Sequence, residues 1–395
     1  MALNFLNLLM VKIRIPVILL LLVILVTSCK GTGERGEEIS EERETMKTAF
    51  IGTYTKKEGH VDGKGAGIYS ISQNSETGAL VMGETVAEII NPSFVKTSPD
   101  KKFLYAVSEL GPRDAASGFI HSFRINPDNT LVETGKISTE GFAPCYIAED
   151  PSGKFVFVAN YVGGVVMMYN KKDDGSLKKI QKITLEDPEN SHPHSVTISA
   201  DNRHVYIADL GRDRIYIFDL NVEEGSLSPN KIPFISLKEG AGPRHFAISP
   251  KGKYAYSINE LNSTISAFKI VNTGELTGIS EISSLPEDYS EKNSAADIHI
   301  HPSGKFLYVS NRGHNSIAAF GIDENSGELS LLGFTPTGGE IPRNFAISRN
   351  GKFLYVANQN SNNITGFNID QATGTLKDAG IDLEINTPVC IEFLN

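Results

Sequence analysis

One stretch of the chain, residues 301–320 (HPSGKFLYVSNRGHNSIAAF), recurs along most of the sequence and constrains the fold more than any other feature. It consists of a Pro-x-Gly turn, an unbroken apolar strand at 306–310, a polar loop and a second strand. Copies with the same order of features begin at Pro151, Ser249 and Ser348, and weaker ones at Ser98 and Ser199. Such self-similarity indicates a repeat architecture, which decides the fold class before any single element is assigned.

Three markers count the repeats, and all three agree on seven. The first is a turn in which Gly or Asn supplies positive φ two residues before a leucine. These leucines recur roughly every fifty residues, as Leu80, Leu131, Leu177, Leu227, Leu276, Leu329 and Leu376. The second marker opens a short strand, at Pro92, Pro144, Pro193, Pro243, Ala295, Pro342 and Pro388. The third is the apolar strand itself, at Phe50, Phe103, Phe155, Val205, Tyr254, Phe306 and Phe353.

Four strands in every copy, with no helical periodicity, predict an all-β fold: a seven-bladed β-propeller with four antiparallel strands per blade. Thr48 falls directly at the second strand of a blade, and the chain finishes at 388–395 with a first strand. The C-terminal strand should therefore complete the first blade and close the ring, which removes open sheet edges. A β-helix or open solenoid is the alternative, and the split blade argues against it.

The N-terminus has the features of a targeting segment. Lys12 and Arg14 precede an apolar run at 15–26, which is short for a transmembrane helix. It ends in Val-Thr-Ser-Cys29, which resembles the lipobox of bacterial lipoproteins, and the resemblance implies cleavage before Cys29 and lipidation there. We therefore expect a lipoprotein signal peptide at 1–28, a disordered tether at 29–47 and the propeller at 48–395. An ordinary signal peptide or an uncleaved anchor is the alternative.

The composition argues against a nucleic-acid partner and against a disulfide bond. The net charge is −10, from 37 basic and 47 acidic residues, so we predict no nucleic-acid partner. Besides Cys29, the chain has only Cys145 and Cys390, which fall on the inner strands of blades three and one. Those blades are not neighbours, and a disulfide needs Cα atoms within about 7 Å, so we expect two buried free thiols.

The repeat also indicates where a functional site would lie. The innermost strand of each blade begins at one mouth of the central channel, and the second strand ends at the same mouth. The residues directly after the strand-opening positions are Ser93, Cys145, His194, Arg244, Ala296, Arg343 and Val389. Those that end the second strands are Tyr54, Glu109, Tyr161, Leu210, Glu260, Arg312 and Gln359. Arginine forks suit the capture of phosphate or carboxylate, and a histidine near a glutamate suits proton transfer.

Six short motifs carry a family resemblance. They are Ser191-His-Pro-His194, Asp209-Leu-Gly-Arg-Asp213, Gly242-Pro-Arg-His245, Asn259-Glu-Leu261, Ser310-Asn-Arg312 and Pro342-Arg-Asn344. In this order they resemble the lactonase family of seven-bladed propellers, which includes propeller-type 6-phosphogluconolactonases and the fungal carboxymuconate lactonising enzyme. The resemblance covers residues 48–395. It implies that His194, Arg244, Glu260 and Arg312 match residues proposed for catalysis or substrate binding in that family.

These observations predict hydrolysis of a small anionic sugar lactone, with 6-phosphogluconolactone as the expected substrate. His194, Glu260 and Arg244 are the expected catalytic residues, and the expected substrate-binding residues are Arg312, Arg343, His192 and Asp209. Arginine would hold the anionic group and stabilise the oxyanion, while His194 or Glu260 takes a proton from water. No spacing of His, Asp or Glu resembles a metal site, so we predict neither metal nor cofactor.

Each of these assignments has a structural alternative. Glu260, Arg244 and Arg312 can tie blades together as ion pairs, and His194 can hydrogen-bond a neighbouring blade. His192 can support its loop, and Asp209 can cap a strand end. His245 should alternate with Arg244 and point between blades. At the level of function, a muconate-type cycloisomerase and a non-catalytic, membrane-tethered binding propeller remain as alternatives.

Overall fold

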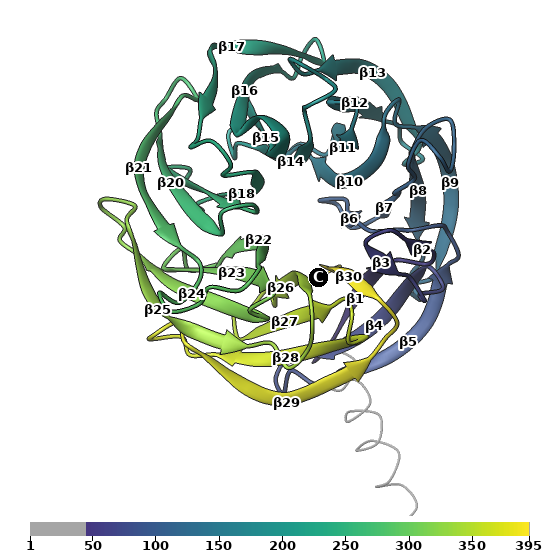
Figure 1. Cartoon of the computed structure of the whole chain (residues 1–395). Helices are drawn as coiled ribbons and strands as arrows, with labels where there is room; N and C mark the ends of the chain where they lie inside the picture. Colours follow the sequence, from purple (N-terminus) through teal and green to yellow (C-terminus); the bar gives the residue numbers. More distant parts are fainter. Residues whose placement is uncertain (1–44, 395) are drawn as a thin grey trace, which may run out of the picture. The chain divides into compact units, whose positions relative to one another are not determined.

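The structure is a computed structural model that describes residues 45–394. In this range the chain forms seven four-stranded antiparallel sheets and one two-stranded sheet, and the seven stand around a central axis (Figure 1). The predicted seven-bladed β-propeller is confirmed. The predicted signal peptide and the tether up to residue 44 lie outside the described residues. No helix within residues 45–394 is long and apolar enough to cross a membrane.

Each blade consists of four strands, numbered outward from the axis. The first strands, in blades 1 to 7, are β30 (Pro388–Phe393), β6 (Val95–Thr97), β10 (Phe142–Glu149), β14 (Pro193–Ile198), β18 (Pro243–Ile248), β22 (Ser294–Ile300) and β26 (Pro342–Ile347). The second strands are β1 (Met46–Thr53), β7 (Phe103–Ser108), β11 (Phe155–Val162), β15 (His204–Asp209), β19 (Tyr254–Asn259), β23 (Phe306–Arg312) and β27 (Phe353–Asn358).

The two outer strands of each blade complete the sheets. The third strands are β4 (Ile68–Asn74), β8 (Phe119–Ile125), β12 (Val165–Lys171), β16 (Arg214–Asn221), β20 (Thr264–Ile270), β24 (Ser316–Ile322) and β28 (Asn363–Ile369). The fourth strands are β5 (Leu80–Ala87), β9 (Leu131–Ser138), β13 (Leu177–Thr184), β17 (Ser226–Ser236), β21 (Leu276–Ser283), β25 (Leu329–Pro336) and β29 (Leu376–Glu384). A small hairpin of β2 (Lys57–Glu58) and β3 (Val61–Asp62) follows β1, and a 3-10 turn, η1 (Leu210–Arg212), follows β15.

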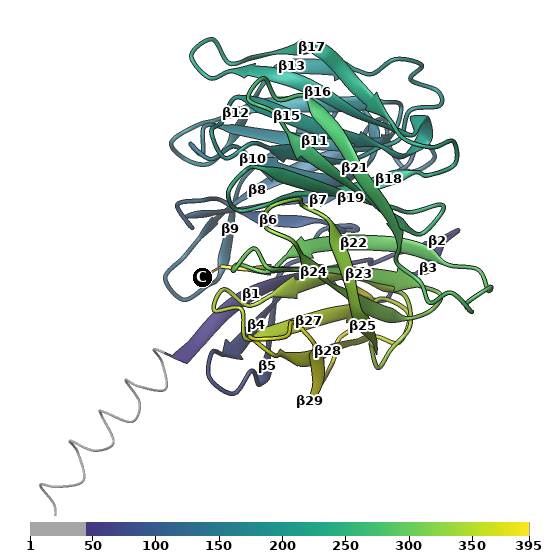
Figure 2. The same cartoon turned by 90° about the vertical axis from the view of Figure 1, so that its left-hand side faces the viewer.

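The ring closes as expected, through the C-terminal strand. β30 pairs antiparallel with β1, with Ile51 opposite Ile391, so both ends of the described chain share blade 1. β1 begins at Met46, two residues before the expected start of the propeller, so residues 46 and 47 belong to a strand and not to the expected disordered tether. The start of β1 and the end of β30 lie on one face of the ring, and the β2–β3 hairpin lies on the other (Figure 2).

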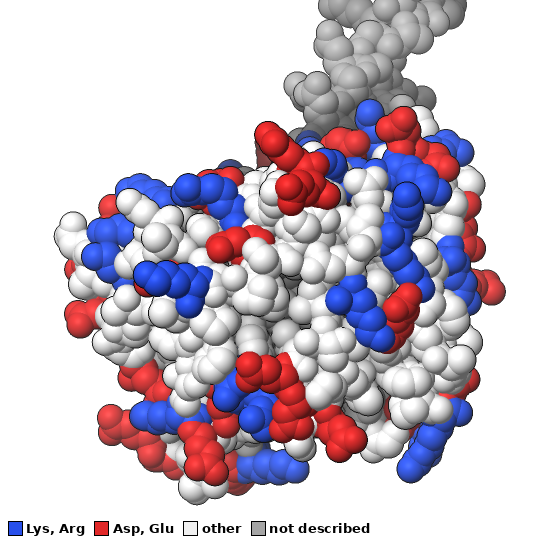
Figure 3. Space-filling model, turned by 90° about the horizontal axis from the view of Figure 1, so that it is seen from above, with Lys and Arg blue, Asp and Glu red and all other residues white. Residues whose placement is uncertain are grey.

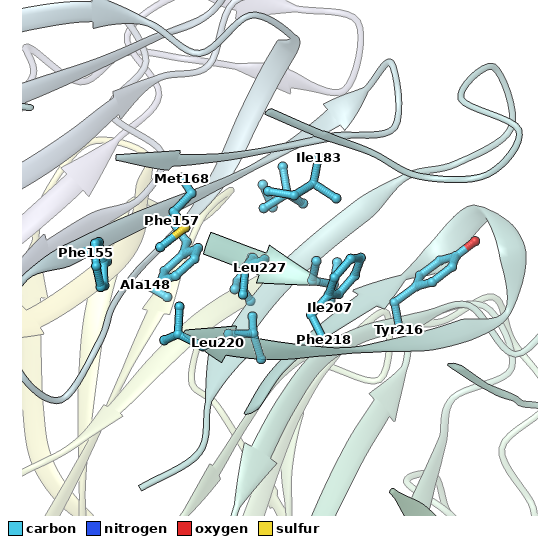
Figure 4. Packing of buried hydrophobic residues seen from close by; sticks show 14 of the residues in the cluster. Ala148, Phe155, Phe157, Met168, Ile183, Ile207, Tyr216, Phe218, Leu220 and Leu227 are labelled. Atoms are coloured by element: carbon cyan, nitrogen blue, oxygen red, sulfur yellow. The ribbon is translucent and has the colours of Figure 1, made fainter. Parts of the chain in front are cut away.

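The second strands are apolar without a break because neighbouring blades cover both of their faces. All six residues of β7, β19 and β27 are buried. Figure 4 shows such an interface between blades 3 and 4, where Phe157 and Met168 pack with Ile207, Phe218 and residues around them. Both Cys145 and Cys390 are buried free thiols, as predicted.

The repeated glycine turns and aromatic strand residues meet between blades. In blade 6, Gly327 has φ of +79°, and a Cβ there would lie 2.4 Å from the Tyr254 ring of blade 5. The Tyr256 hydroxyl of the same strand donates to the Gly327 carbonyl oxygen at 2.9 Å. Equivalent tyrosine-to-glycine bonds join other blades, from Tyr105 to Gly175, Tyr206 to Gly274, Tyr308 to Gly374 and Tyr355 to Gly78.

Substitution of Gly327 tests this blade-to-blade contact. Gly327→Ala should lose ~1–2 kcal/mol of unfolding free energy to the left-handed backbone and a further ~1–3 kcal/mol to the clash with Tyr254. Gly252→Ala is the matched control, because Gly252 also has positive φ (+67°) but no heavy atom within 4 Å of its Cβ position. Urea unfolding of both variants measures the difference. Equal losses in the two variants would show that the turn glycines do not join the blades.

Candidate functional site

Beta-bulges recur at one point of the inner strands and present side chains to the channel mouth. In β18, Pro243 lies opposite Asn259 and His245 opposite Ile258, so Arg244 has no partner in the ladder. His194 in β14 and Arg343 in β26 are left out of their ladders in the same way. A β-bulge bends the strand and redirects a side chain, and for this reason β-bulges are common beside functional sites. Cys145, Val389 and Ala296 occupy the corresponding positions of other blades.

Glu260 lies between two arginines at this mouth. It directly follows β19, where its backbone N–H donates to the Gly242 carbonyl at 2.7 Å. Its Oε2 is 2.9 Å from Arg244 Nε and 2.9 Å from Arg312 Nη2, and Arg312 is the last residue of β23 in the next blade. Arg244 is 2% exposed and Glu260 19%. The arrangement is a largely buried Arg–Glu–Arg triad, which we call the mouth triad.

The two arginines of the mouth triad also bond the start of the inner strand of blade 6. Arg244 Nη1 donates to the Ala296 carbonyl oxygen at 2.5 Å, and Arg312 Nη2 donates to the Ala295 carbonyl oxygen at 3.1 Å. Burial would raise the pKa of Glu260, but Arg312 and Arg244 outweigh it and lower that pKa below its ordinary value. Burial, with help from Arg312 and Arg343, lowers the pKa of Arg244 to about 10. All three groups are therefore charged at neutral pH.

A second cluster at the mouth contains Arg343. Arg343 Nη2 donates to the Tyr54 hydroxyl at 3.0 Å, and that hydroxyl donates to both carboxylate oxygens of Glu109 at 3.0 Å. Burial raises the pKa of Tyr54, so it remains a neutral phenol. His60, between β2 and β3, packs edge-on against the Tyr54 ring at 5.3 Å. Within residues 45–394, Arg343 forms no ion pair at short range, in contrast to Arg244 and Arg312.

His194 is a neutral imidazole at the mouth. It lies at the bulge of β14, and its ring packs edge-on against Tyr161 at 5.6 Å and against His245 at 5.3 Å. Burial and the nearby charge of Arg244 lower its pKa well below the ordinary value. Its Nδ1 is buried without a hydrogen-bond partner in the described part of the chain. This argues against the alternative that His194 serves to hydrogen-bond a neighbouring blade.

Two of the residues expected to bind substrate hold a loop instead. Asp209 is 0% exposed, and its Oδ1 accepts from the backbone N–H groups of His192 and Gly211, which caps η1. His192 pairs through Nδ1 with the Tyr161 carbonyl oxygen at 2.8 Å and stacks on the Tyr161 ring at 4.6 Å. A side chain without accessible surface cannot contact a substrate, so we assign Asp209 to the loop. The contacts of His192 match the loop-supporting alternative.

The expectation that His245 points between blades is wrong. The bulge at Arg244 breaks the alternation of the strand, so both side chains lie in the channel and touch, with Arg244 Nη1 3.2 Å from His245 Nε2. On its other side, His245 Nδ1 pairs with the buried carboxylate of Asp297 at 2.7 Å. Asp297 carries no signal in the sequence, because only the inter-blade geometry brings it to His245. Tyr54 and Glu109 do occupy the strand-end positions that the repeat marks.

The described residues include no group of three His, Cys, Asp or Glu side chains arranged to hold a metal ion. Outside the mouth, charge is mixed. Figure 3 shows Lys and Arg interspersed with Asp and Glu on the face seen from above. The mouth brings three arginines and two glutamates together with a neutral histidine.

Comparison with known proteins gives one consistent family. The sequence model described as "Lactonase, 7-bladed beta-propeller" matches residues 48–393. A Formosa agariphila protein named 6-phosphogluconolactonase is 38% identical over 315 residues, which cover 75% of this chain and 85% of that protein. A Bacillus subtilis protein of the same name is 32% identical over 360 residues, which cover 89% of this chain and 99% of that protein.

Solved structures agree with these relatives. A putative 6-phosphogluconolactonase from Bacteroides fragilis superposes with a TM-score of 0.80 and 33% identity, covering 89% of this chain and 98% of the other. The periplasmic gluconolactonase of Pseudomonas aeruginosa superposes with a TM-score of 0.82 and 28% identity, covering 89% of this chain and 99% of the other. These two similar structures therefore carry two substrate names, one phosphorylated and one not.

Neutralising Glu260 tests the mouth triad as an electrostatic unit. Glu260→Gln leaves Arg244 buried without a counter-charge, which should cost ~3–5 kcal/mol of unfolding free energy at pH 7. Because the pKa of Glu260 is lowered on folding, its charge stabilises the fold above the ordinary pKa of glutamate. The difference between wild type and variant should therefore shrink as the pH falls through the lowered pKa. Urea unfolding at pH 7 and at acid pH measures it.

The matched control is Glu281→Gln, which removes a carboxylate paired with the exposed Lys238 at 2.6 Å. An exposed pair of this kind contributes ~1 kcal/mol or less. If Glu260→Gln is as mild as this control, or if its effect does not vary with pH, the mouth triad is not held by the charge of Glu260.

Proposed function

Because the chain belongs to the lactonase family of seven-bladed β-propellers, we propose that it hydrolyses 6-phosphogluconolactone to 6-phosphogluconate. The observation that carries the proposal is the neutral His194 imidazole in a mouth that also holds three arginines. A base kept neutral beside fixed positive charge is the arrangement that attack of water on a lactone carbonyl requires.

The residues divide the reaction between them. The lactone carbonyl oxygen points to Arg244, whose charge stabilises the negative oxygen that develops when water attacks the carbonyl carbon. The His194 imidazole accepts a proton from that water as the new C–O bond forms. The bond from the carbonyl carbon to the ring oxygen then breaks, and His194 returns the proton to the ring oxygen, which leaves as a hydroxyl. The product is a single open-chain sugar acid, which carries both the new carboxyl group and the released hydroxyl.

The mouth triad positions the guanidinium groups rather than supplying a second base. Glu260 is ionised and shared by Arg244 and Arg312, so its Oε2 is already occupied. Between the two bases considered from the sequence, we therefore assign proton transfer to His194 and orientation of the arginines to Glu260.

Arg343 holds the phosphate. Arg244 and Arg312 are paired with Glu260 and with backbone carbonyls, whereas the hydrogen bond of Arg343 goes to a neutral phenol. Its guanidinium is thus the one of the three that can take an incoming dianion without breaking an ion pair. Glu109, through Tyr54, keeps the fork oriented.

Two variants assayed on two substrates test these roles. His194→Ala should lower the rate on both 6-phosphogluconolactone and plain gluconolactone by about 100- to 10,000-fold, as loss of a general base does. Arg343→Gln should cost ~2–5 kcal/mol in kcat/KM on the phosphorylated lactone and little on the plain one. Spontaneous lactone opening is measured without protein and subtracted.

These measurements also decide between the proposal and its alternatives. If wild type and His194→Ala both open the two lactones at the spontaneous rate, the protein is not a lactonase and the binding propeller takes its place. If Arg343→Gln slows both substrates equally, Arg343 acts on the lactone ring rather than on the phosphate. A preference of the wild type for plain gluconolactone would align the chain with the Pseudomonas periplasmic enzyme instead.

We also propose that the mature protein is a bacterial cell-envelope lipoprotein, anchored through Cys29 and facing the periplasm or the exterior. The support is the sequence alone: a basic start, an apolar run and the Val-Thr-Ser-Cys29 ending.

Replacement of Cys29 tests the anchor. Cys29→Ser should abolish incorporation of labelled fatty acid and move the protein out of the membrane fraction, or leave it as a longer uncleaved precursor. Cys145→Ser, which changes a buried thiol, should keep both the label and the fractionation. Unchanged labelling, size and fractionation of Cys29→Ser would contradict the lipoprotein assignment.

A further inference from the structure

A buried carboxylate below the mouth is surrounded by hydrogen-bond donors from three blades. Asp297, on β22, is 2% exposed. Its Oδ1 accepts from the backbone N–H of Ile298 at 2.9 Å and pairs with His245 Nδ1 at 2.7 Å. Its Oδ2 pairs with His299 Nε2 at 3.0 Å and accepts from Asn344 Nδ2 at 2.6 Å and from the backbone N–H of Phe345 at 3.2 Å.

Other blades of the propeller have no carboxylate at the position of Asp297. Asp297 directly follows Ala296 within the irregular stretch of β22, and the corresponding residues of other blades are Tyr146, Ser195, His245, Asn344 and Cys390. None of these is acidic. A buried charge carries a desolvation cost that these uncharged residues avoid, so a purely structural role does not explain why blade 6 has an aspartate.

The contacts of His245 define its tautomer. Burial would raise the pKa of Asp297, but His299 and His245 outweigh it and lower that pKa well below its ordinary value. Burial, together with Arg244, lowers the pKa of His245 to about 4. A neutral imidazole facing a carboxylate carries its proton on the facing nitrogen, Nδ1. The lone pair of Nε2 is therefore free to accept from Arg244 Nη1, 3.2 Å away.

We propose that Asp297 is a positioning residue for lactone hydrolysis, which acts through His245 to hold the Arg244 guanidinium toward Glu260 and the mouth. The chain of contacts runs from Asp297 through His245 to Arg244 and ends at Glu260 Oε2. Tyr146 packs edge-on against the His245 ring at 5.1 Å and keeps it in this plane. The inference rests on the proposed function, because Arg244 is the group that stabilises the oxyanion there.

His245 lies where the mouth meets a cavity inside the channel. His245, Asp297 and His299 line a cavity of about 450 Å³ in the channel, and Lys96 and Glu392 form an ion pair at 3.1 Å in the same lining. His245 belongs to both this cavity and the mouth, since its other contacts are Arg244 and His194. The tautomer of His245 therefore links the buried carboxylate of Asp297 to Arg244 at the mouth.

Asp297→Asn is the informative substitution, since it keeps the shape and removes the charge. Two donors converge on Oδ2, from Asn344 and Phe345, against the single backbone N–H of Ile298 on Oδ1, so the amide oxygen should take the place of Oδ2 and turn the amide NH2 toward His245. His245 would then carry its proton on Nε2, and two donors would face each other between His245 and Arg244. We expect kcat to fall up to about 100-fold, by the same factor on phosphorylated and plain lactones, with little change in KM.

The tautomer is measured directly, and without any lactone, by imidazole ¹⁵N resonances of histidine-labelled full-length protein. The expected result is an unprotonated Nε2 of His245 in the wild type and a protonated Nε2 in Asp297→Asn. Asp219→Asn is the matched control, because it neutralises a carboxylate that pairs with the Nδ1 of another histidine, His204, at 3.0 Å on the third strand of blade 4. It should retain the wild-type tautomer of His245 and the wild-type kcat.

A double variant separates positioning from a general loss of structure. If Asp297 acts through Arg244, Asp297→Asn should slow an Arg244→Ala protein no further, whereas independent effects would multiply. Wild-type kcat in Asp297→Asn, an unchanged His245 tautomer or multiplied effects in the double variant would each overturn the proposal. A protein with no lactonase activity at all would instead contradict the proposed function, and the resonances would still report whether Asp297 sets the tautomer.

Discussion

The antiparallel pairing of β30 with β1 is the interaction on which the rest of the structure depends. It joins the two ends of the described chain within blade 1 and leaves each innermost strand packed between two others. The mouth exists only in a closed ring, because its groups come from blades that are far apart in sequence. Arg343 of blade 7 meets Tyr54 of blade 1 across 289 residues of chain, and their contact lies beside the closing strand.

Within the closed ring, the blade interfaces are held by one repeated packing contact, whereas the mouth is formed by side chains that differ from blade to blade. The interfaces repeat one solution: an aromatic residue packs on a turn glycine with positive φ, and a tyrosine hydroxyl bonds its carbonyl. At the mouth, the bulge positions of the innermost strands carry arginine, histidine, alanine, valine or cysteine, and the bulges direct these side chains toward one axis. Burial then sets the charges. It keeps His194 neutral, while the arginines around Glu260 keep that carboxylate ionised.

The sequence was sufficient to predict the blade count, the split first blade and the residues of the mouth, because each depends on a periodic feature. The glycine turns, the strand-opening prolines and the apolar strands all repeat. Because the repeat is regular, the residues that differ between copies can be recognised in the sequence, and they include His194, Arg244, Glu260, Arg312 and Arg343. The β-bulges could not be predicted from the sequence. Without them Arg244 and His245 were expected on opposite sides of β18, and the structure places them in contact.

Asp209 and Asp297 show that the position of a residue in the repeat does not by itself reveal its role. Asp209 follows an apolar strand at a marked position, yet it is fully buried and caps η1. Asp297 stands at an unmarked position, yet it lies two hydrogen-bonded contacts from the mouth triad. Burial and inter-blade neighbours decide both cases, and a single sequence records neither. Periodicity therefore identifies the ring of candidate residues, and the three-dimensional neighbours decide which of them act.

The most direct test of this account is a crystal structure of the protein with a hydrolysis-resistant analogue, the lactam of 6-phosphogluconate. The account predicts the ring at the mouth, with the carbonyl oxygen on Arg244, the phosphate on Arg343 and the His194 imidazole facing the carbonyl carbon. An analogue that binds in the channel cavity beside Lys96 and Glu392, or that leaves the mouth empty at saturating concentration, would contradict it.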